Sequence, residues 1–160
     1  MKLVYGITVL ILRSMHAGIF LNSTSQLDDT FFEKTQVFIT ELNEKGAIGF
    51  VVNRPFSRTF NELEEFKHSK PIPLYEGGPV DQEHLFFIHQ RPDLIKDGTT
   101  VINNICVGGD FKDAVRLINN NTLSEKDIKL FIGYCGWNDQ ELEAEIAEGS
   151  WEILKEGSPF

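Results

Sequence analysis

The sequence predicts one compact α+β domain. Its 160 residues are enough for a single domain with a buried core. The hydrophobic fraction is 41% and the charged fraction is 24%, which are values of an ordinary globular protein and not of a disordered chain. The first predicted strands pair in a hairpin, and later strands are separated by helices. This order favours an α+β fold over a regular doubly wound sheet.

Apolar runs rich in β-branched residues predict the strands of the first half of the chain. Residues 17–21 form the first expected strand, and residues 28–33 form a turn. The runs at 35–42 and 47–52 flank the segment Asn43-Glu44-Lys45-Gly46. This spacing predicts a hairpin with a turn slightly longer than the tightest kind.

A capping box predicts a short helix after this hairpin. The Thr59 hydroxyl can accept from the backbone N–H of Glu62, whose carboxylate can reach back to the cap. Phe60, Leu63 and Phe66 then give the helix an apolar face. Further apolar runs predict strands at residues 71–75, 84–89 and 99–105.

The last part of the chain predicts two helices around one central strand. Asp110 caps a helix whose apolar face includes Phe111, Ala114 and Ile118. Residues 128–134 are almost continuously apolar, which is typical of a strand in the centre of a sheet.

Signals at both ends define the last helix. Asn138 is the expected N-cap, and Glu141 stands at the N3 position of a capping box. Trp137 and Leu142 occupy the two positions of a hydrophobic staple around this helix start. Gly149 supplies the stop signal.

Charge and cysteine content exclude several classes of function. The formal net charge is −9, and the 15 Lys and Arg residues are scattered and form no basic patch. Since an acidic surface repels phosphate backbones, we do not expect direct nucleic-acid binding. Cys106 and Cys135 do not form the pattern of a disulfide framework, which is typical of a reduced, cytoplasmic protein.

The N-terminal residues allow two interpretations. The apolar run Leu3–Leu12, between Lys2 and Arg13, superficially resembles a signal peptide. It is too short to span a bilayer, and no suitable cleavage site follows it, so we expect no association with a membrane. Residues 1–14 are either a strand that joins the domain or an extension before a start at Met15.

Standard catalytic and metal-binding motifs are absent from the sequence. The chain contains no nucleophile elbow, no phosphate-binding P-loop and no zinc-protease helix motif. If His84 and His89 share a strand, their odd separation places them on opposite faces, where they cannot chelate one metal together. The sequence therefore predicts no metal and no cofactor, and enzymatic activity is not the favoured function.

The segment Asn53-Arg54-Pro55 is the most suggestive polar cluster. It follows directly on the apolar run Gly49–Val52, so a strand would deliver an amide and a guanidinium to the end of a sheet. Arginine can grip a carboxylate or phosphate with two hydrogen bonds. In the structural alternative, which we favour, Asn53 bonds the backbone in a tight turn and Arg54 pairs with one of many carboxylates.

Four sequence segments occur in a characteristic order. They are Leu27–Glu33, Gly46–Gly49 running into Val52–Pro55, Gly77-Gly78-Pro79-Val80, and Gly133–Trp137 continuing to Trp151. No segment is specific alone, but the ordered set resembles the YqgE/AlgH family of bacterial proteins over nearly everything from Ala17 to Trp151. Thr30, where members usually carry proline, and Cys135, where a smaller residue is common, depart from the family pattern.

This resemblance implies a single α+β domain with a mixed, partly barrel-like β-sheet and flanking helices. The family pattern begins near Met15, which favours one domain at residues 15–160 and an N-terminal extension at residues 1–14. The family has no established activity. Its name is associated with transcriptional control of alginate synthesis, but this chain has no convincing helix-turn-helix pattern.

Three hypotheses for the function follow. The favoured one is a non-enzymatic cytoplasmic binding or regulatory protein that acts through a protein partner or a small ligand. The alternatives are a transcriptional regulator, which rests on the family name alone, and an unrecognised enzyme built around the Asn-Arg-Pro cluster and His89. The candidate ligand-binding residues are Asn53, Arg54, Gly77, Gly78, His89 and Trp137.

Overall fold

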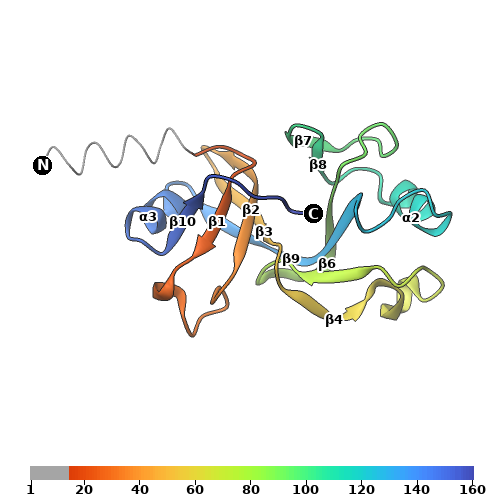
Figure 1. Cartoon of the computed structure of the whole chain (residues 1–160), viewed down its shortest axis with the longest axis horizontal. Coiled ribbons are helices and arrows are strands. Elements are labelled where there is room, and N and C mark those ends of the chain that lie inside the picture. Colours follow the sequence, from red (N-terminus) through yellow and green to blue (C-terminus); the bar gives the residue numbers. More distant parts are fainter. Residues whose placement is uncertain (1–14) are drawn as a thin grey trace, which may run out of the picture. The chain divides into compact units, whose positions relative to one another are not determined.

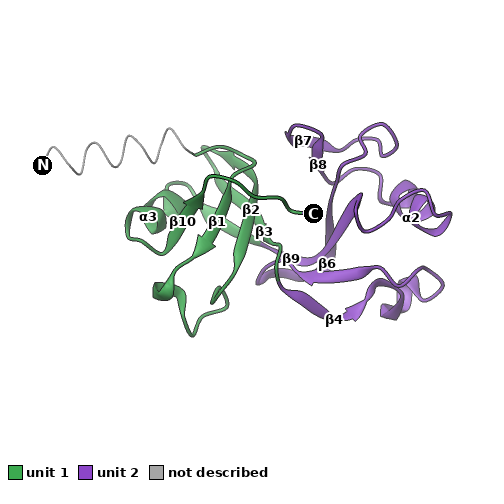
Figure 2. Ribbon diagram, in the orientation of Figure 1, with its two compact units in different colours: residues 1–53, 135–159 green, residues 54–134, 160 purple. Residues whose placement is uncertain are grey.

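The computed structural model describes residues 15–160 (Figure 1). The interpretation of residues 1–14 as an extension lies outside the described residues. The described chain divides into two compact units, which Figure 2 colours separately. The predicted domain therefore contains two units, and its behaviour as a single domain stays a prediction. Unit 1 comprises residues 15–53 and 135–159, and unit 2 comprises residues 54–134 and Phe160.

Unit 1 contains an antiparallel sheet with the strand order β10-β1-β2-β3-β9. Strands β2 and β3 form the predicted hairpin, in which Asn43 pairs with Gly46. The φ of Gly46 is 132°, a backbone conformation that residues with a side chain rarely adopt. The strands are β1 (Phe20–Ser23), β2 (Gln36–Asn43), β3 (Gly46–Val51), β10 (Trp151–Leu154) and the last residues of β9 (Ile128–Asn138), and the turn η1 (Ser25–Leu27) follows β1.

The core of unit 1 lies between this sheet and helix α3 (Glu141–Ala147). Leu21, Val37 and Ile39 come from the sheet and are fully buried. Leu142 and Ile146, which are one turn apart on α3, belong to the same cluster. Burial of each such side chain stabilises the fold by about 1.5–3 kcal/mol relative to exposure.

Unit 2 contains a mixed sheet, as the resemblance implied. The first part of β9 pairs antiparallel with β6, which pairs antiparallel with β8, and β7 completes this side. On its other edge, β9 pairs in parallel with β5, and β5 pairs antiparallel with β4. The strands are β4 (Pro55–Thr59), β5 (Pro73–Glu76), β6 (Val80–His89), β7 (Thr99–Ile102) and β8 (Ile105–Val107).

Helix α2 (Phe111–Asn119) packs on the core of unit 2. Its buried side chains include Ala114 and Ile118, which lie in one cluster with Leu130 of β9. The predicted N-cap is confirmed, because the Asp110 carboxylate accepts from the Asp113 N–H at 3.2 Å.

The sheet is open in the part of the chain that the structure describes. Strand β10 pairs with β1 alone, β7 pairs with β8 alone and β4 pairs with β5 alone, so each of these strands has a free edge. The partly barrel-like sheet that the resemblance implied is therefore not supported. Sheet is the main regular secondary structure of residues 15–160, which also contain two α-helices.

Two predicted elements have a different local structure. The helix after the capping box is replaced by the 3-10 turns η2 (Phe60–Glu62) and η3 (Glu64–Phe66). Leu63 between them has an extended backbone, with a φ of −80° and a ψ of 131°, and so interrupts the predicted helix. The single strand predicted at residues 99–105 is a hairpin of β7 and β8, which turns at Asn103 with a φ of 51°.

The last helix begins later than predicted. Asn138 pairs with Gly46 as the end of β9, and Gln140, with a φ of 66°, is the N-cap of α3. Glu141 is therefore the first residue of α3 and not N3, so the predicted capping box is absent, although the Glu141 carboxylate accepts from the Asn138 N–H at 2.8 Å. Gly149, with a φ of 88°, follows the helix as predicted. The short strands β4 and β10 were not predicted.

Strand β9 contributes residues to both units, and its glycine at position 133 permits a close backbone crossing in unit 2. The φ of Gly133 is 71°, which is the left-handed conformation. A Cβ atom at this position would overlap the carbonyl oxygen of Gly78 and lie 2.8 Å from that of Val80. Only glycine therefore lets β9 pass this close to the backbone that enters β6.

We expect Gly133→Ala to destabilise the protein by about 3 kcal/mol or more, because backbone strain and overlap with two carbonyl groups add together. Gly108→Ala is the matched control. Gly108 has a φ of 70°, but a Cβ there would meet nothing within 4 Å, so only the strain of about 1 kcal/mol applies. Urea unfolding of both variants measures the difference. Equal losses would show that the crossing at Gly133 does not constrain the fold.

Candidate functional site

Asn53, an exposed residue, holds a turn of unit 1 together. Its side-chain oxygen accepts from the Gln36 N–H at 2.8 Å, and its side-chain nitrogen donates to the Lys34 carbonyl oxygen at 3.1 Å. Both ends of the amide therefore bind the backbone that leads into β2. Asn53 thus bonds the backbone, as the structural alternative expected, but the bonded residues lie where β2 begins and do not belong to the turn that contains Asn53 itself.

Arg54 and Gly77 take part in backbone hydrogen bonds of unit 2, and Gly78 lies against β9. The Arg54 carbonyl oxygen accepts from the Glu76 N–H at 2.9 Å, next to the pairing of β4 with β5. The Gly77 N–H donates to the carbonyl oxygen of Ile132 in β9 at 2.8 Å. Gly78 is the residue whose carbonyl group excludes a side chain from position 133. These contacts join the strands around β9.

His89 is fully buried at the end of β6. Its Nδ1 accepts from the Arg91 N–H at 3.1 Å, so its Nε2 carries the proton and donates to the Gly108 carbonyl oxygen at 3.1 Å. The ring also stacks on Phe87, with 5.9 Å between ring centroids. Burial lowers the pKa of His89, although the bond to Gly108 opposes this shift. Both nitrogens are engaged, so the ring has a structural role.

Trp137 belongs to an aromatic cluster in unit 1. Its indole Nε1 donates to Glu145 Oε2 at 2.7 Å, and the indole of Trp151 donates to the same oxygen at 3.0 Å. The two indole rings meet edge to face with centroids 6.1 Å apart, and Phe32 contacts both. One carboxylate from α3 thus fixes two strands of the sheet beneath the helix.

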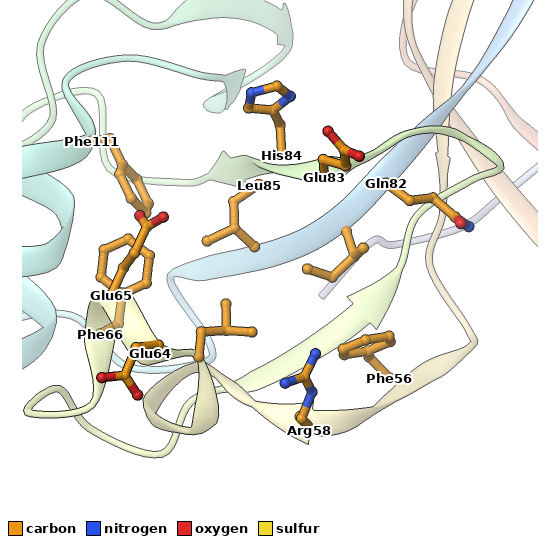
Figure 3. A pocket seen from close by; sticks show the side chains of 12 residues that line it. Phe56, Arg58, Glu64, Glu65, Phe66, Gln82, Glu83, His84, Leu85 and Phe111 are labelled. Atoms are coloured by element: carbon orange, nitrogen blue, oxygen red, sulfur yellow. The ribbon is translucent and has the colours of Figure 1, made fainter.

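A groove of about 540 Å³ lies in unit 2, and none of the six candidate residues lines it. The suggestion that those six bind a ligand stays a prediction. Figure 3 shows the groove, with side chains of β6 along one wall and side chains of β4 along the opposite wall. The lining residues are Phe56, Arg58, Leu63, Glu64, Glu65, Phe66, Gln82, Glu83, His84, Leu85, Phe111 and Ile132.

Apolar side chains from four parts of unit 2 form the floor of the groove. Phe56 comes from β4, Leu63 from between the two 3-10 turns, Leu85 from β6 and Ile132 from β9. Each is only half-buried and packs on the core of unit 2 from the outside. Phe111 of α2 adds a ring at one end. Half-buried apolar side chains that share one hollow are typical of binding sites.

An irregularity in β6 shapes one wall of the groove. Strand β6 pairs with β9 at Val80 and again from Leu85, and the residues between them leave the regular register. Asp81 has a φ of 52°, which is unusual for a residue other than glycine. Its carboxylate bonds the Nδ1 of His84 at 2.6 Å, and the Gln82 side chain donates to the carbonyl oxygen of Gly78. Bulges of this kind re-aim side chains beside functional sites.

The opposite wall is built on β4 and the two 3-10 turns. The Glu62 carboxylate accepts from the Thr59 N–H at 3.2 Å, so the reach-back contact of the predicted capping box is present. Phe66 stacks on the buried ring of Phe60 at 4.4 Å between centroids. This packing holds the segment with Glu64 and Glu65 at the mouth of the groove (Figure 3).

The groove offers apolar contact and charge, with no serine, threonine or cysteine among its lining residues. Among residues 15–160, no group of three or more His, Cys, Asp or Glu side chains is placed to hold a metal ion. No helix in this part of the chain is long and apolar enough to cross a membrane.

Sequence reasoning missed the groove, because its lining residues are far apart along the chain. A signal was present in β6, where the exposed polar run 81–84 precedes the buried residues 87–89. When the first half of a strand is polar and the second half is apolar, the pattern indicates that the first half lies outside the core. The partner segments at residues 56–66, 111 and 132 carry no comparable signal.

Comparison with known proteins gives consistent relatives. A family model described as AlgH-like matches residues 20–159. A UPF0301 protein of Chlorobium luteolum is 34% identical over 87% of this chain and 74% of its own length. A UPF0301 protein of Cytophaga hutchinsonii is 36% identical over 85% of this chain and 75% of its own length.

Two solved structures share the fold. The solution structure of the AlgH protein from Pseudomonas aeruginosa has a TM-score of 0.71 and 26% sequence identity, and it covers 88% of this chain and 77% of that chain. A crystal structure of protein DIP2367 from Corynebacterium diphtheriae has a TM-score of 0.72 and 19% identity, and it covers 91% and 78%. None of these names states a reaction or a ligand.

The two histidines of β6 should titrate on opposite sides of the usual value of 6.5. The hydrogen bond to Asp81 raises the pKa of the exposed His84, whereas burial lowers the pKa of His89. Nitrogen NMR of the imidazoles measures both midpoints and should find His89 protonated on Nε2 at neutral pH.

Neutral His89 also links stability to pH. As the pH falls, His89 takes up a proton in the unfolded chain before it does so in the folded protein. The contribution of neutral His89 to the free energy of unfolding is therefore complete above pH 6.5, and it is lost as the pH falls through the lower folded pKa. In His89→Gln this part of the loss of stability at acid pH should disappear. His84→Gln is the control variant, in which the loss due to His89 should remain. A midpoint for His89 above 6.5 would contradict the structural role.

Proposed function

The chain belongs to the AlgH-like family, and we propose that it is a non-enzymatic, cytoplasmic binding protein whose site is the groove of unit 2. The observation that carries this proposal is the apolar floor of the groove, enclosed between two walls that bear charged side chains. A regulatory role would follow from the binding of a partner at this site.

The size and chemistry of the groove suit a binding site. Its volume of about 540 Å³ lies within the usual range of roughly 300–1,000 Å³ for ligand pockets. Half-buried Leu63, Leu85 and Ile132 expose apolar surface that a ligand could remove from water. A few charged groups around such a floor supply orientation and specificity.

Two alternatives have less support. An enzyme built around His89 needs a ring with a free nitrogen, and both nitrogens of this ring are bonded to the backbone. A regulator that touches DNA through this groove would bring phosphates to Glu64, Glu65 and Glu83, which repel them.

Titration of the ¹⁵N-labelled protein with N-acetyl-leucinamide and N-acetyl-phenylalaninamide tests the proposal. These neutral probes supply an apolar side chain without charge. We expect saturable shifts of amide signals around Leu63, Leu85 and Phe111, with a Kd of about 1 mM, since a ligand of this size gains about 4 kcal/mol.

Leu85→Trp and Leu94→Trp form a matched pair for this titration. Both leucines are half-buried and pack on the core of unit 2, but only Leu85 lines the groove. The shifts should vanish in Leu85→Trp and persist in Leu94→Trp, provided that both variants keep the dispersed spectrum of the folded protein. Shifts that do not saturate, or that both variants share, would contradict the groove as the binding site.

A further inference from the structure

We propose that the groove of unit 2 binds a basic amphipathic peptide segment of a protein partner, in which apolar side chains stand beside lysine or arginine. This inference rests on the proposed function and names the chemical class of its partner. It follows from the distribution of charge around the groove.

Carboxylates are the largest charged group at the mouth of the groove. Glu64, Glu65 and Glu83 all line it, and all three are exposed. Glu64 pairs with Lys67 at 3.2 Å, but both side chains are mainly in solvent, so this pair holds little energy. Within residues 15–160, no ion pair involves Glu65 or Glu83.

The cations of the groove do not balance these carboxylates. His84 is bonded to Asp81, so even a protonated imidazole is already matched by an adjacent negative charge. Arg58 lies on the opposite wall with its Cζ 5.8 Å from the ring centroid of Phe56. One guanidinium therefore faces two carboxylates that lack an ion pair, and the mouth of the groove is negative.

The whole chain adds to this local field. Its formal net charge of −9 attracts cations and repels anions at long range. An acidic peptide, a nucleic acid or an anionic lipid surface would be repelled both by the carboxylates at the groove and by the net charge of the protein. A basic partner gains from both, and its association should depend on salt.

The floor sets the second requirement for the partner. A highly basic segment without apolar side chains would leave Leu63, Leu85 and Ile132 in contact with water. A segment with apolar side chains covers this surface and brings its basic groups to the exposed carboxylates at the same time. A groove of about 540 Å³ holds a few side chains and no folded domain, so the bound part is a short segment.

Arg58 makes the expected binding directional. A lysine of the peptide close to this guanidinium would be repelled, so the basic groups should lie away from Arg58, beside Glu83 on the β6 wall or beside Glu65 of the 3-10 turns. Figure 3 shows Glu83 and Arg58 on opposite sides of the groove. Replacement of Arg58 by glutamine should therefore leave binding unchanged or make it tighter.

Isothermal titration of the full chain with three synthetic peptides of equal length tests the proposal. The first alternates leucine with lysine, the second replaces lysine by glutamate, and the third replaces leucine by serine. We expect only the first to bind with one-to-one stoichiometry, and more weakly at high salt. The serine peptide measures attraction to the net charge of the protein alone.

Two double variants of the protein carry equal changes of charge. Glu65→Gln with Glu83→Gln removes carboxylates at the groove, whereas Glu44→Gln with Glu125→Gln removes exposed carboxylates elsewhere. The first pair should weaken binding of the leucine–lysine peptide about three- to tenfold, which is the range for two exposed charge pairs. The second pair should leave the affinity within about twofold, since distant charges act only through the screened field.

Each other outcome overturns the inference. Equal binding of the serine–lysine peptide would mean non-specific charge attraction, and equal or tighter binding of the leucine–glutamate peptide would assign the groove to an acidic partner. An absence of any binding would also contradict it. If the neutral leucine and phenylalanine probes still shift the groove signals in that case, the proposed function stands and only the class of partner is wrong.

Discussion

The close passage of β9 against the backbone before β6 is the constraint on which unit 2 depends. Gly133 adopts a left-handed conformation there, and the carbonyl groups of Gly78 and Val80 occupy the space that a side chain would need. The same strand carries β5 on one edge and β6 on the other, and its last residues pair with β3 in unit 1. A glycine in the middle of a central strand usually weakens it. Here glycine is required because the backbone that enters β6 leaves no space for a side chain.

This constraint gives the family motifs a structural interpretation. The glycines at 77 and 78 belong to the crossing, and Asn53 fixes the backbone before β2 with both ends of its amide. Trp137 shares the carboxylate of Glu145 with Trp151 and so fastens α3 to the sheet. The contacts described for these residues are thus those of a scaffold. The residues that line the groove are different ones, and they lie on the outside of that scaffold.

Much of the fold could be predicted from the sequence, because long apolar runs and capping residues act locally. The hairpin of β2 and β3, helix α2 and the stop at Gly149 are examples. Strands β4 and β10 were missed since each is short, and β4 is mostly exposed. The groove could not be predicted, because β4, the 3-10 turns, β6, α2 and β9 each supply one or two half-buried residues that look ordinary alone. His89 shows the converse, since burial makes a promising residue structural.

The proposed binding surface is the groove on the outside of unit 2, and Asn53 and Trp137 do not line it. A crystal structure of the full chain with the leucine–lysine peptide tests this most directly. We expect peptide density in the groove, with leucine side chains against Leu63 and Leu85 and a lysine close to Glu83. Peptide density against Asn53 or Trp137, with an empty groove, would contradict it.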